Sequence, residues 1–452
     1  MKVKKPLSPI TLPVIFFAGV IALGTVLLHS PFSLNQRPLS WLDALFTATS
    51  ATCVTGLTVV DTGTFFSRFG QTVILCLIQL GGLGIMSFTS LTFYLLRKRV
   101  SMADKIAVGQ GLLHDPNFQL GQFLQRIFFW TMIIELCGAF FIFIQGHAEF
   151  SLFSAVFHSV SAFCNAGFSL NPHSLVPWCG NWGINFVFIV LIVLGGLGFS
   201  VLVECQQYIF AMIKNPGSRR RRLSWYSTTV IKTSLFLILV GAFAIFFAEN
   251  IGFSKHISSS EAILGALFQS VTCRTAGFNT VNIGLMTNAS LLIMIILMFI
   301  GGAPGSCAGG IKVTTFRVLW AFIKAQLKGK TQAVIGKYAI DKKSLSNALI
   351  LFVFAGALIV FAVLLLNFTE GGDIPHPQAK GLFMEIVFEA VSAFGTVGLS
   401  TGLTPRLSDG GRIIITLLMF IGRLGPLVLL VSFQSMQKKE LYAWPEEKIL
   451  IG

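Results

Sequence analysis

The chain has 452 residues, of which 54% are hydrophobic and only 11% are charged, and its mean hydropathy is +0.79. No water-soluble domain of this length has such a composition, so the sequence predicts a multi-pass membrane protein. The formal net charge of +15 would suggest nucleic acid binding in a soluble protein. We attribute it instead to the Lys and Arg excess of cytoplasmic loops, and we expect no nucleic acid partner.

Apolar runs close to the roughly 20 residues needed to cross a bilayer occur along the whole chain. We predict eight membrane spans, one of them interrupted, at residues 12–28, 71–96, 123–144, 184–213, 229–248, 291–300, 348–366 and 413–432. The segments on one side of these spans, at residues 1–11, 97–126, 214–232, 312–343 and 438–452, hold 25 of the 33 Lys and Arg residues. Both termini are therefore expected in the cytoplasm.

Two basic connectors on that side, at residues 97–122 and 324–346, have too few apolar residues for a soluble domain and are expected to be short helices or linkers. The run of four arginines at residues 219–222 is expected to bind anionic membrane lipid, and a docking patch for an acidic partner is the alternative. The chain has no GxGxxG between a strand and a helix and no GxxxxGK[ST]. We therefore expect it to bind no nucleotide itself.

Four short segments share one pattern: SATCVTGLT at residues 50–58, SAFCNAGFS at 161–169, SVTCRTAGFN at 270–279 and SAFGTVGLS at 392–400. Their glycines are 111, 110 and 121 residues apart, and a Phe precedes each glycine by 9 or 10 residues. A pattern that repeats at such a period indicates the architecture. We predict an all-α fold of four units, at residues 1–100, 101–215, 216–330 and 331–452, each comprising a helix, a re-entrant helix, a glycine loop and a helix.

The re-entrant helices are predicted at residues 42–52, 152–163, 262–272 and 382–394, and each is too short to cross the bilayer. Each must turn back at mid-depth, where irregular backbone is tolerated only if it is buried in protein or lines water. The four loops should therefore meet around one aqueous axis within a single chain. Each short helix would direct roughly half a negative charge toward that axis and favour a cation there.

A selectivity filter of backbone carbonyls is predicted in these loops, because such oxygens can replace the hydration shell of a cation. Glycine permits positive φ and close approach of neighbouring backbones. The alternative is that the glycines only allow close helix packing, which would not recur at a fixed distance after a short helix. The expected ion-binding residues are Val54, Thr55, Gly56, Asn165, Ala166, Gly167, Thr275, Ala276, Gly277, Thr396, Val397 and Gly398.

The last helix of the third unit contains GGAPGSCAGG at residues 301–310, which cannot stay α-helical, because proline removes a backbone donor and glycine adds flexibility. We predict an unwound gate beneath the filter, with a static kink as the alternative. An unpaired charge inside an apolar helix is costly, so Arg423 should tether this loop or make purely structural hydrogen bonds. Lys312 is expected to make the inner mouth positive. The expected gate residues are Gly301, Gly302, Ala303, Pro304, Gly305, Ser306, Cys307, Ala308, Gly309, Gly310, Lys312 and Arg423.

Several other polar residues lie near the loops. Glu385 and Glu389, one turn apart, suggest cation attraction or a salt bridge, whereas His158 is expected to be a buried histidine with satisfied hydrogen bonds. No cluster of His, Cys or carboxylates has catalytic or metal-binding spacing, so we expect no enzyme. Three polar residues follow the filter glycines by four or five positions: Asp61, Asn171 and Asn282. We expect them to form either a polar outer mouth or ordinary turns.

Taken together, six passages resemble the membrane subunits of bacterial Ktr potassium-uptake systems, in the Ktr/Trk/HKT superfamily. They are LFTATSATCVTGLTVVDTGT at residues 45–64, FHSVSAFCNAGFS at 157–169, QSVTCRTAGFNT at 269–280, MFIGGAPGSCAGGIKVTTF at 298–316, EAVSAFGTVGLSTGLTP at 389–405 and MFIGRLGP at 419–426. The resemblance implies K⁺ uptake across the bacterial cell membrane, often with Na⁺ dependence. It also implies a homodimer with one pore per subunit, gated by a cytoplasmic nucleotide-binding ring.

Within the resembled family, glycine in all four loops accompanies K⁺ selectivity, and Gly56 fits that rule. Cys307 stands where the resemblance predicts Ser or Thr. The alternative function is a sodium-coupled secondary transporter of another solute that rocks two inverted repeats. Fourfold repetition in a single sense argues against this alternative, and flux without a co-transported organic solute would exclude it.

Overall fold

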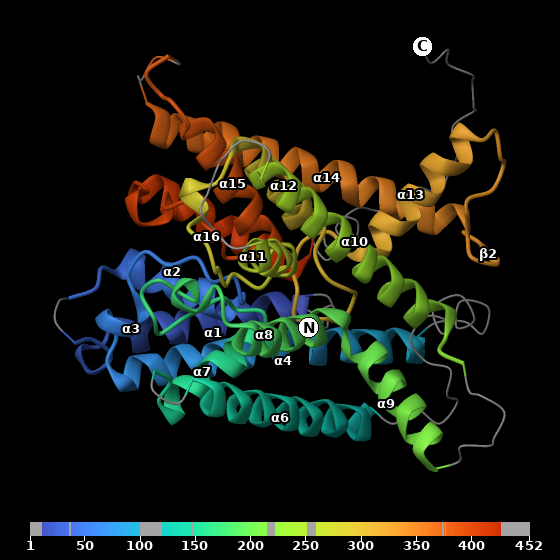
Figure 1. The fold of residues 1–452 in the computed structure, drawn as a ribbon, viewed down its shortest axis with the longest axis horizontal. Helices are drawn as coiled ribbons and strands as arrows, with labels where there is room; N and C mark the ends of the chain where they lie inside the picture. The colour runs from blue at the N-terminus through green and yellow to red at the C-terminus, as the bar shows by residue number, and fades with distance from the viewer. Residues whose placement is uncertain are drawn as a thin grey trace, which may run out of the picture.

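The computed structural model describes residues 11–35, 38–99, 120–146, 149–214, 222–250, 259–372, 375 and 377–425, and these are mostly helical (Figure 1). In this part of the chain the strands are β1 (Val334–Ile335) and β2 (Tyr338–Ala339), which pair antiparallel. The expectation of only helices or linkers at residues 324–346 was therefore wrong. Gly336 has a φ of +65°, which allows the tight turn between the two strands.

The long helices are α1 (Thr11–His29), α4 (Arg68–Arg99), α6 (Leu120–Gln145), α10 (Trp225–Asn250) and α14 (Lys342–Leu366). Among the described residues, three stretches are long and apolar enough to cross a membrane: 125–145, 225–249 and 342–371. A fourth such span arises if α8 (Trp182–Leu197) and α9 (Phe199–Lys214) are taken together. The prediction of eight spans stays a prediction.

The predicted span at residues 184–213 is not one straight helix, because α8 and α9 meet at an angle of 109°. Gly198, between them, has a φ of +83°, which is outside the helical range. The backbone N–H of Phe199 donates to Gly305 O at 3.2 Å, so the break is held by the 301–310 loop of the next unit. The continuous apolar run did not predict this break, because hydropathy carries no information on backbone conformation.

The structure has short helices at the four places where re-entrant helices are predicted: α2 (Trp41–Thr52), α7 (Leu152–Phe163), α11 (Ser259–Thr272) and α15 (Leu382–Gly395). Serine side chains cap two of them: Ser40 Oγ accepts from Asp43 N at 3.0 Å and Ser151 Oγ from Ser154 N at 3.2 Å. The phenylalanine that each motif carries is fully buried, which anchors each short helix in the core. These four are Phe46, Phe157, Phe268 and Phe388.

The helices that follow the loops are α4, α8, α12 (Asn288–Phe299) and α16 (Asp409–Leu424). In three of them a glycine packs against the end of the preceding short helix. A Cβ on Gly81, Gly195 or Gly422 would lie within 2.0 Å of a carbonyl oxygen of that helix, so only glycine permits this contact. The remaining helical elements are η1 (Pro31–Ser33), α3 (Thr62–Phe65), η2 (Val176–Trp178), η3 (Ile283–Leu285), α13 (Val313–Leu327), η4 (Asn367–Gly371) and η5 (Thr404–Arg406).

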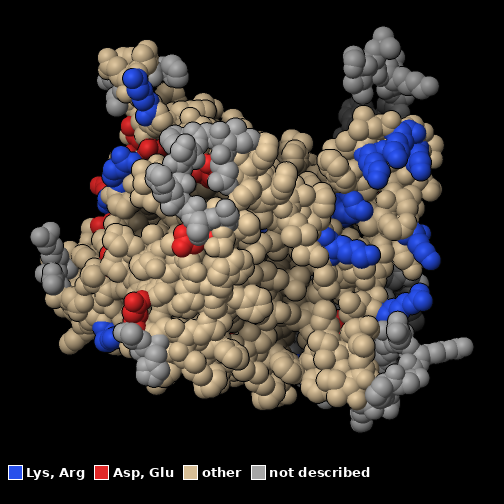
Figure 2. Space-filling view, in the orientation of Figure 1, with Lys and Arg blue, Asp and Glu red and all other residues tan. Residues whose placement is uncertain are grey.

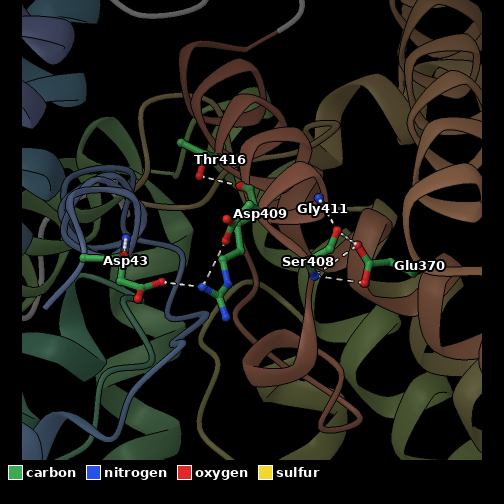
Figure 3. A network of polar contacts seen from close by, with 8 residues as sticks. Asp43, Glu370, Ser408, Asp409, Gly411 and Thr416 are labelled. Carbon is green, nitrogen blue, oxygen red and sulfur yellow. Dashed lines mark hydrogen bonds and ion pairs between the residues drawn. The ribbon is translucent and has the colours of Figure 1, made fainter.

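The first and last units of the chain lie side by side, with α2 against α16 (Figure 1). Figure 3 shows the polar contacts at this seam: Arg412 Nη1 lies 2.9 Å from the Asp43 carboxylate and 3.6 Å from that of Asp409. Ser408 Oγ caps α16 by accepting from Gly411 N at 3.1 Å, and it also donates to Glu370. The first and fourth units are therefore in direct contact.

Charged residues are separated along the molecule. Figure 2 shows most of the visible Lys and Arg at the end where α13 and α9 lie. Most visible Asp and Glu, with a few Lys or Arg, lie toward the opposite end, and a broad uncharged band separates the two ends. The basic end includes Lys324, Lys328 and Lys337. The arginines at 219–221 lie outside the described residues. An uncharged band between charged ends is the surface that a membrane-spanning protein presents to lipid.

Candidate functional site

The four glycine loops come together in one closed arrangement, which we call the glycine ring (residues 54–56, 165–167, 275–277 and 396–398). Each glycine faces the carbonyl oxygen that precedes the glycine of a neighbouring loop. The pairs, with the distance from a Cβ built on the glycine to that oxygen, are Gly56 and Ala166 (2.5 Å), Gly167 and Ala276 (2.9 Å), Gly277 and Val397 (2.7 Å), and Gly398 and Thr55 (2.0 Å). Real Cβ atoms essentially never approach so closely. Glycine is therefore required at all four positions.

The backbone of each loop has the same alternating conformation. The glycines have φ of +96°, +69°, +82° and +86°, and the residues two positions earlier are also left-handed: Val54 (54°), Asn165 (58°), Thr275 (77°) and Thr396 (49°). In a regular extended strand, successive carbonyls point to opposite sides. A left-handed residue at every second position turns successive carbonyls toward the same side. Left-handed non-glycine residues cost about 1–3 kcal/mol each and cluster at functional sites.

The carbonyls of the glycine ring differ from their neighbours in their hydrogen bonding. None of them, three in each loop, accepts a hydrogen bond from a residue that the structure describes. By contrast, the carbonyl just after the glycine is bound in three loops by a short-helix hydroxyl: Ser50 Oγ donates to Leu57 O (2.7 Å), Ser161 Oγ to Phe168 O (2.8 Å) and Thr272 Oγ1 to Phe278 O (2.6 Å). Buried carbonyls without a donor are costly, so this ring is suited to binding a cation.

The third loop is one residue shorter than the others at the helix end. In the first, second and fourth loops, the N–H before the glycine donates to the carbonyl five residues earlier, at 2.7–2.8 Å. In the third loop, Ala276 N donates to Thr272 O, only four residues earlier, at 2.9 Å. This difference explains why the Phe and the glycine are 9 residues apart in this unit and 10 in the others.

A cavity of about 170 Å³ lies against the glycine ring. The four residues placed two positions after the glycines all line it: Thr58, Ser169, Asn279 and Ser400. Asp61 and Asn171 line it too, and Asp61 Oδ1 also caps α3 by accepting from Thr64 N at 2.8 Å, so this residue combines a cavity-lining position with ordinary turn chemistry. Asn282 does not line it, and its side chain caps η3 by accepting from Gly284 N, which is the turn chemistry expected as the alternative.

The 301–310 loop, which joins α12 to α13, is not helical, as its glycines and proline predict. Its neck is closed by backbone hydrogen bonds from Gly301 N to Ile311 O (2.8 Å) and from Val313 N to Gly302 O (3.0 Å). A Cβ on Gly309 would lie 2.3 Å from Thr396 Oγ1. The loop therefore packs directly against the fourth loop of the glycine ring.

Three basic side chains donate to carbonyls of the 301–310 loop. Arg423 donates to Cys307 O and, at 2.6 Å, to Gly81 O in α4, so the predicted contact with this loop is present. Lys312 Nζ donates to Ala308 O at 2.5 Å and so points toward the loop rather than acting only as a distant charge. The third side chain, Arg274, comes from the third glycine loop and donates to Gly301 O at 3.0 Å.

Sequence reasoning missed Arg274 as a partner of this loop. The residue is only 7% exposed, and it lies in an otherwise uncharged stretch of the chain. Two signals could have identified it: a charged residue inside a buried motif, and the shortened spacing from Phe268 to Gly277. The sequence could not name its partner, because the contact depends on how the third unit folds back on itself.

Comparisons with known proteins show which family the chain resembles. The model of the TrkH family, described as cation transport protein, matches residues 14–442. The chain is 38% identical to Ktr system potassium uptake protein B of Bacillus subtilis over 450 residues, 98% of this chain and 96% of that protein. It is 35% identical to potassium/sodium uptake protein NtpJ of Enterococcus hirae over 100% of this chain and 99% of that protein.

The fold is also similar to a solved structure. The crystal structure of the potassium transporter TrkH from Vibrio parahaemolyticus matches with a TM-score of 0.72, covering 95% of this chain and 86% of that one, at 19% identity. Such low identity supports the fold rather than the details of the site. The family match extends over nearly the whole chain, including all four glycine loops and the 301–310 loop. The chain therefore belongs to the TrkH family of cation transport proteins.

Proposed function

We propose that this protein carries out potassium uptake through one pore formed within a single chain, with the glycine ring as its selectivity filter. The observation that carries the proposal is the closed ring of four glycines whose carbonyls have no donor among the described residues. Such carbonyls can replace the hydration shell of K⁺. The names of two relatives, a potassium uptake protein and a potassium/sodium uptake protein, support K⁺ as the main ion and Na⁺ as a second or activating ion.

The 301–310 loop is proposed as the gate, together with Lys312 and Arg423. It packs against Thr396 of the glycine ring and is held there by basic side chains. Opening would require these side chains to exchange their carbonyl partners for water or other groups. Hydrogen bonds to charged groups are worth about 1.5–3 kcal/mol each, so the closed position is favoured until a regulatory signal is applied.

The membrane arrangement that we propose has eight spans in four units, with both termini in the cytoplasm. The basic end around α13 and α9 (Figure 2) is then the cytoplasmic side, in agreement with the usual excess of Lys and Arg there. The relatives named as parts of a Ktr system support a regulatory partner for this chain. A homodimer and a cytosolic nucleotide-binding ring are proposed on the same grounds, with no nucleotide bound by this chain.

The test is the flux of K⁺ and of Na⁺ into proteoliposomes that contain this chain alone, measured beside Gly56→Ser. A serine there would have to adopt a φ of +96° and would place Cβ 2.5 Å from Ala166 O, so the ring must distort. We expect K⁺-selective flux in the unmodified chain and Na⁺-permeable flux in the variant. Gly19→Ser is the control, because a Cβ on Gly19 has no neighbour within 4 Å. Equal flux of both ions in all three proteins would contradict the proposal.

A further inference from the structure

The residue after the motif phenylalanine occupies an equivalent place on each short helix and is buried in every unit. These residues are Thr47, His158, Gln269 and Glu389, with exposed fractions of 2%, 0%, 1% and 0%. The residues two positions after the glycines line the cavity at one end of the ring, which is the outer end in the proposed orientation, and His158 and Glu389 contact two of them, Ser169 and Ser400. Two of the four are titratable, and those two make contacts that the other two lack.

In the second unit, His158 Nε2 lies 3.0 Å from Ser169 Oγ and accepts from Leu170 N at 3.3 Å. Because a backbone N–H can only donate, Nε2 is an acceptor. The hydrogen of the neutral ring is therefore on Nδ1, which donates to Ser154 O at 2.7 Å. Both ring nitrogens are satisfied, and the ring connects the short helix to the cavity-lining serine.

In the fourth unit, Glu389 makes the equivalent connection. Its Oε1 accepts from Ser400 Oγ, from Thr404 N at 2.9 Å and from Thr404 Oγ1 at 2.7 Å. Ser400 Oγ in turn accepts from Gly402 N at 2.9 Å. The carboxylate therefore ties the segment that leaves the fourth loop to the short helix that precedes it.

The first and third units lack this connection. Thr47 Oγ1 and both polar atoms of the Gln269 side chain have no hydrogen-bond partner among the described residues. Asn279, which corresponds to Ser169, donates to Val281 O at 3.0 Å, much as Ser169 Oγ donates to Asn171 O at 3.1 Å, but Asn279 makes no hydrogen bond to Gln269 among the described residues. Because the contacts between the glycines follow the order of the loops around the ring, the second and fourth loops face each other across it. The two connected loops thus lie on one diagonal.

We propose that His158 and Glu389 are positioning residues that hold the outer end of the glycine ring open along this diagonal and so contribute to selectivity for the larger K⁺ over the smaller Na⁺. This inference rests on the proposed function of the ring as a filter. Carbonyls must move inward to coordinate a smaller ion. Hydrogen bonds that fix Ser169 and Ser400 to their short helices oppose this movement.

The test compares the K⁺/Na⁺ permeability ratio of the full chain in proteoliposomes with that of two Glu389 variants. Glu389→Met removes the acceptor, and we expect the ratio to fall by roughly fivefold, the equivalent of one lost hydrogen bond. Glu389→Gln keeps an acceptor oxygen and should restore most of the ratio, which a purely space-filling role would not predict. His158→Leu and His158→Gln form the corresponding pair in the second unit. If Glu389→Met fails to fold, Ser400→Ala removes the donor of the same hydrogen bond instead of its acceptor.

The equivalent positions of the other diagonal supply matched controls. Thr47→Val and Gln269→Met remove polar atoms that have no partner among the described residues, with little change in volume, so the ratio should stay within about twofold of the unmodified chain. An unchanged ratio in folded Glu389→Met and Ser400→Ala would overturn the inference while leaving the filter intact. An equal fall in the two controls would also overturn it. Loss of selectivity already in the unmodified chain would instead contradict the proposed function.

Discussion

The glycine ring and the 301–310 loop are both unwound, glycine-containing backbone in the interior of a membrane protein, yet their carbonyls have different partners. In the 301–310 loop, the oxygens of Gly301, Cys307 and Ala308 each accept a hydrogen bond from a basic side chain. In the glycine ring, the described residues provide no donor to any of the carbonyls. A carbonyl that is already bound to a cationic group is a poor ligand for a passing cation.

The comparison separates two contributions to function. Glycine gives both regions a backbone shape that other residues cannot adopt. The neighbouring side chains then decide whether the carbonyls of that shape are available to an ion or occupied by the protein. The first three of the predictions that follow alter one region or the other, and the fourth alters the seam between α2 and α16 as a contrast. They begin with the largest expected effect.

Gly398→Ala should have the largest effect, a nearly complete loss of K⁺-selective flux. The new Cβ would lie 2.0 Å from Thr55 O, the shortest such distance in the glycine ring, and the backbone at this residue has a φ of +86°. The flux of K⁺ and Na⁺ into proteoliposomes measures this effect. Gly356→Ala in α14 is the matched control, because nothing lies within 4 Å of its Cβ position. Unchanged selectivity in folded Gly398→Ala would show that the ring is not the filter.

Deletion of residues 303–309 should raise cation flux, because it removes the part of the loop that packs against the glycine ring. The hydrogen bond from Gly301 N to Ile311 O lies outside the deleted segment, so the neck of the loop can still close. Flux into proteoliposomes, with detergent gel filtration to confirm folding, measures the result. Flux that is unchanged or lower in a folded, inserted protein would favour a static kink over a gate.

Arg423→Ala should raise the basal cation flux by several-fold and weaken the regulation of that flux by the gate. Arg423 joins Cys307 O to Gly81 O in the first unit, whereas Arg274 donates to Gly301 O within the third unit. Arg274→Ala should therefore have the smaller effect of the two, since charge-assisted bonds contribute about 1.5–3 kcal/mol each. The same flux assay ranks both variants. If the flux of Arg423→Ala equalled that of the unmodified chain, the role of this arginine would be structural only.

Arg412→Ala should have the smallest effect, a slight loss of thermal stability with unchanged ion selectivity. The side chains of Arg412 and Asp43 are 21% and 18% exposed, and such partly exposed ion pairs contribute about 0.2–1 kcal/mol. The apparent melting temperature in detergent measures the loss. Arg406→Ala breaks the more exposed pair with Glu385 and should cost less still. A large change in selectivity on Arg412→Ala would mean that the seam between α2 and α16 controls the ring.

Much of the site could be predicted from the sequence because it repeats. The four phenylalanines, the four short helices and the break at residues 301–310 all correspond to local patterns, and the structure contains them. Local patterns did not predict the break at Gly198, the pairing of β1 with β2, or the place of Asn282 outside the cavity. Each of these depends on backbone conformation or on a neighbour that hydropathy and spacing do not report.

By itself, the sequence determined that the chain is a membrane protein with four glycine loops, because composition and backbone-permissive residues act locally. Only the tertiary structure decided which carbonyls have no donor among the described residues, which basic side chains reach the 301–310 loop, and which cavity-lining residues His158 and Glu389 contact. Those outcomes depend on contacts between residues that are distant in sequence. A hydrogen bond such as that from Arg423 to Gly81 O, between residues 342 positions apart, has no local signature.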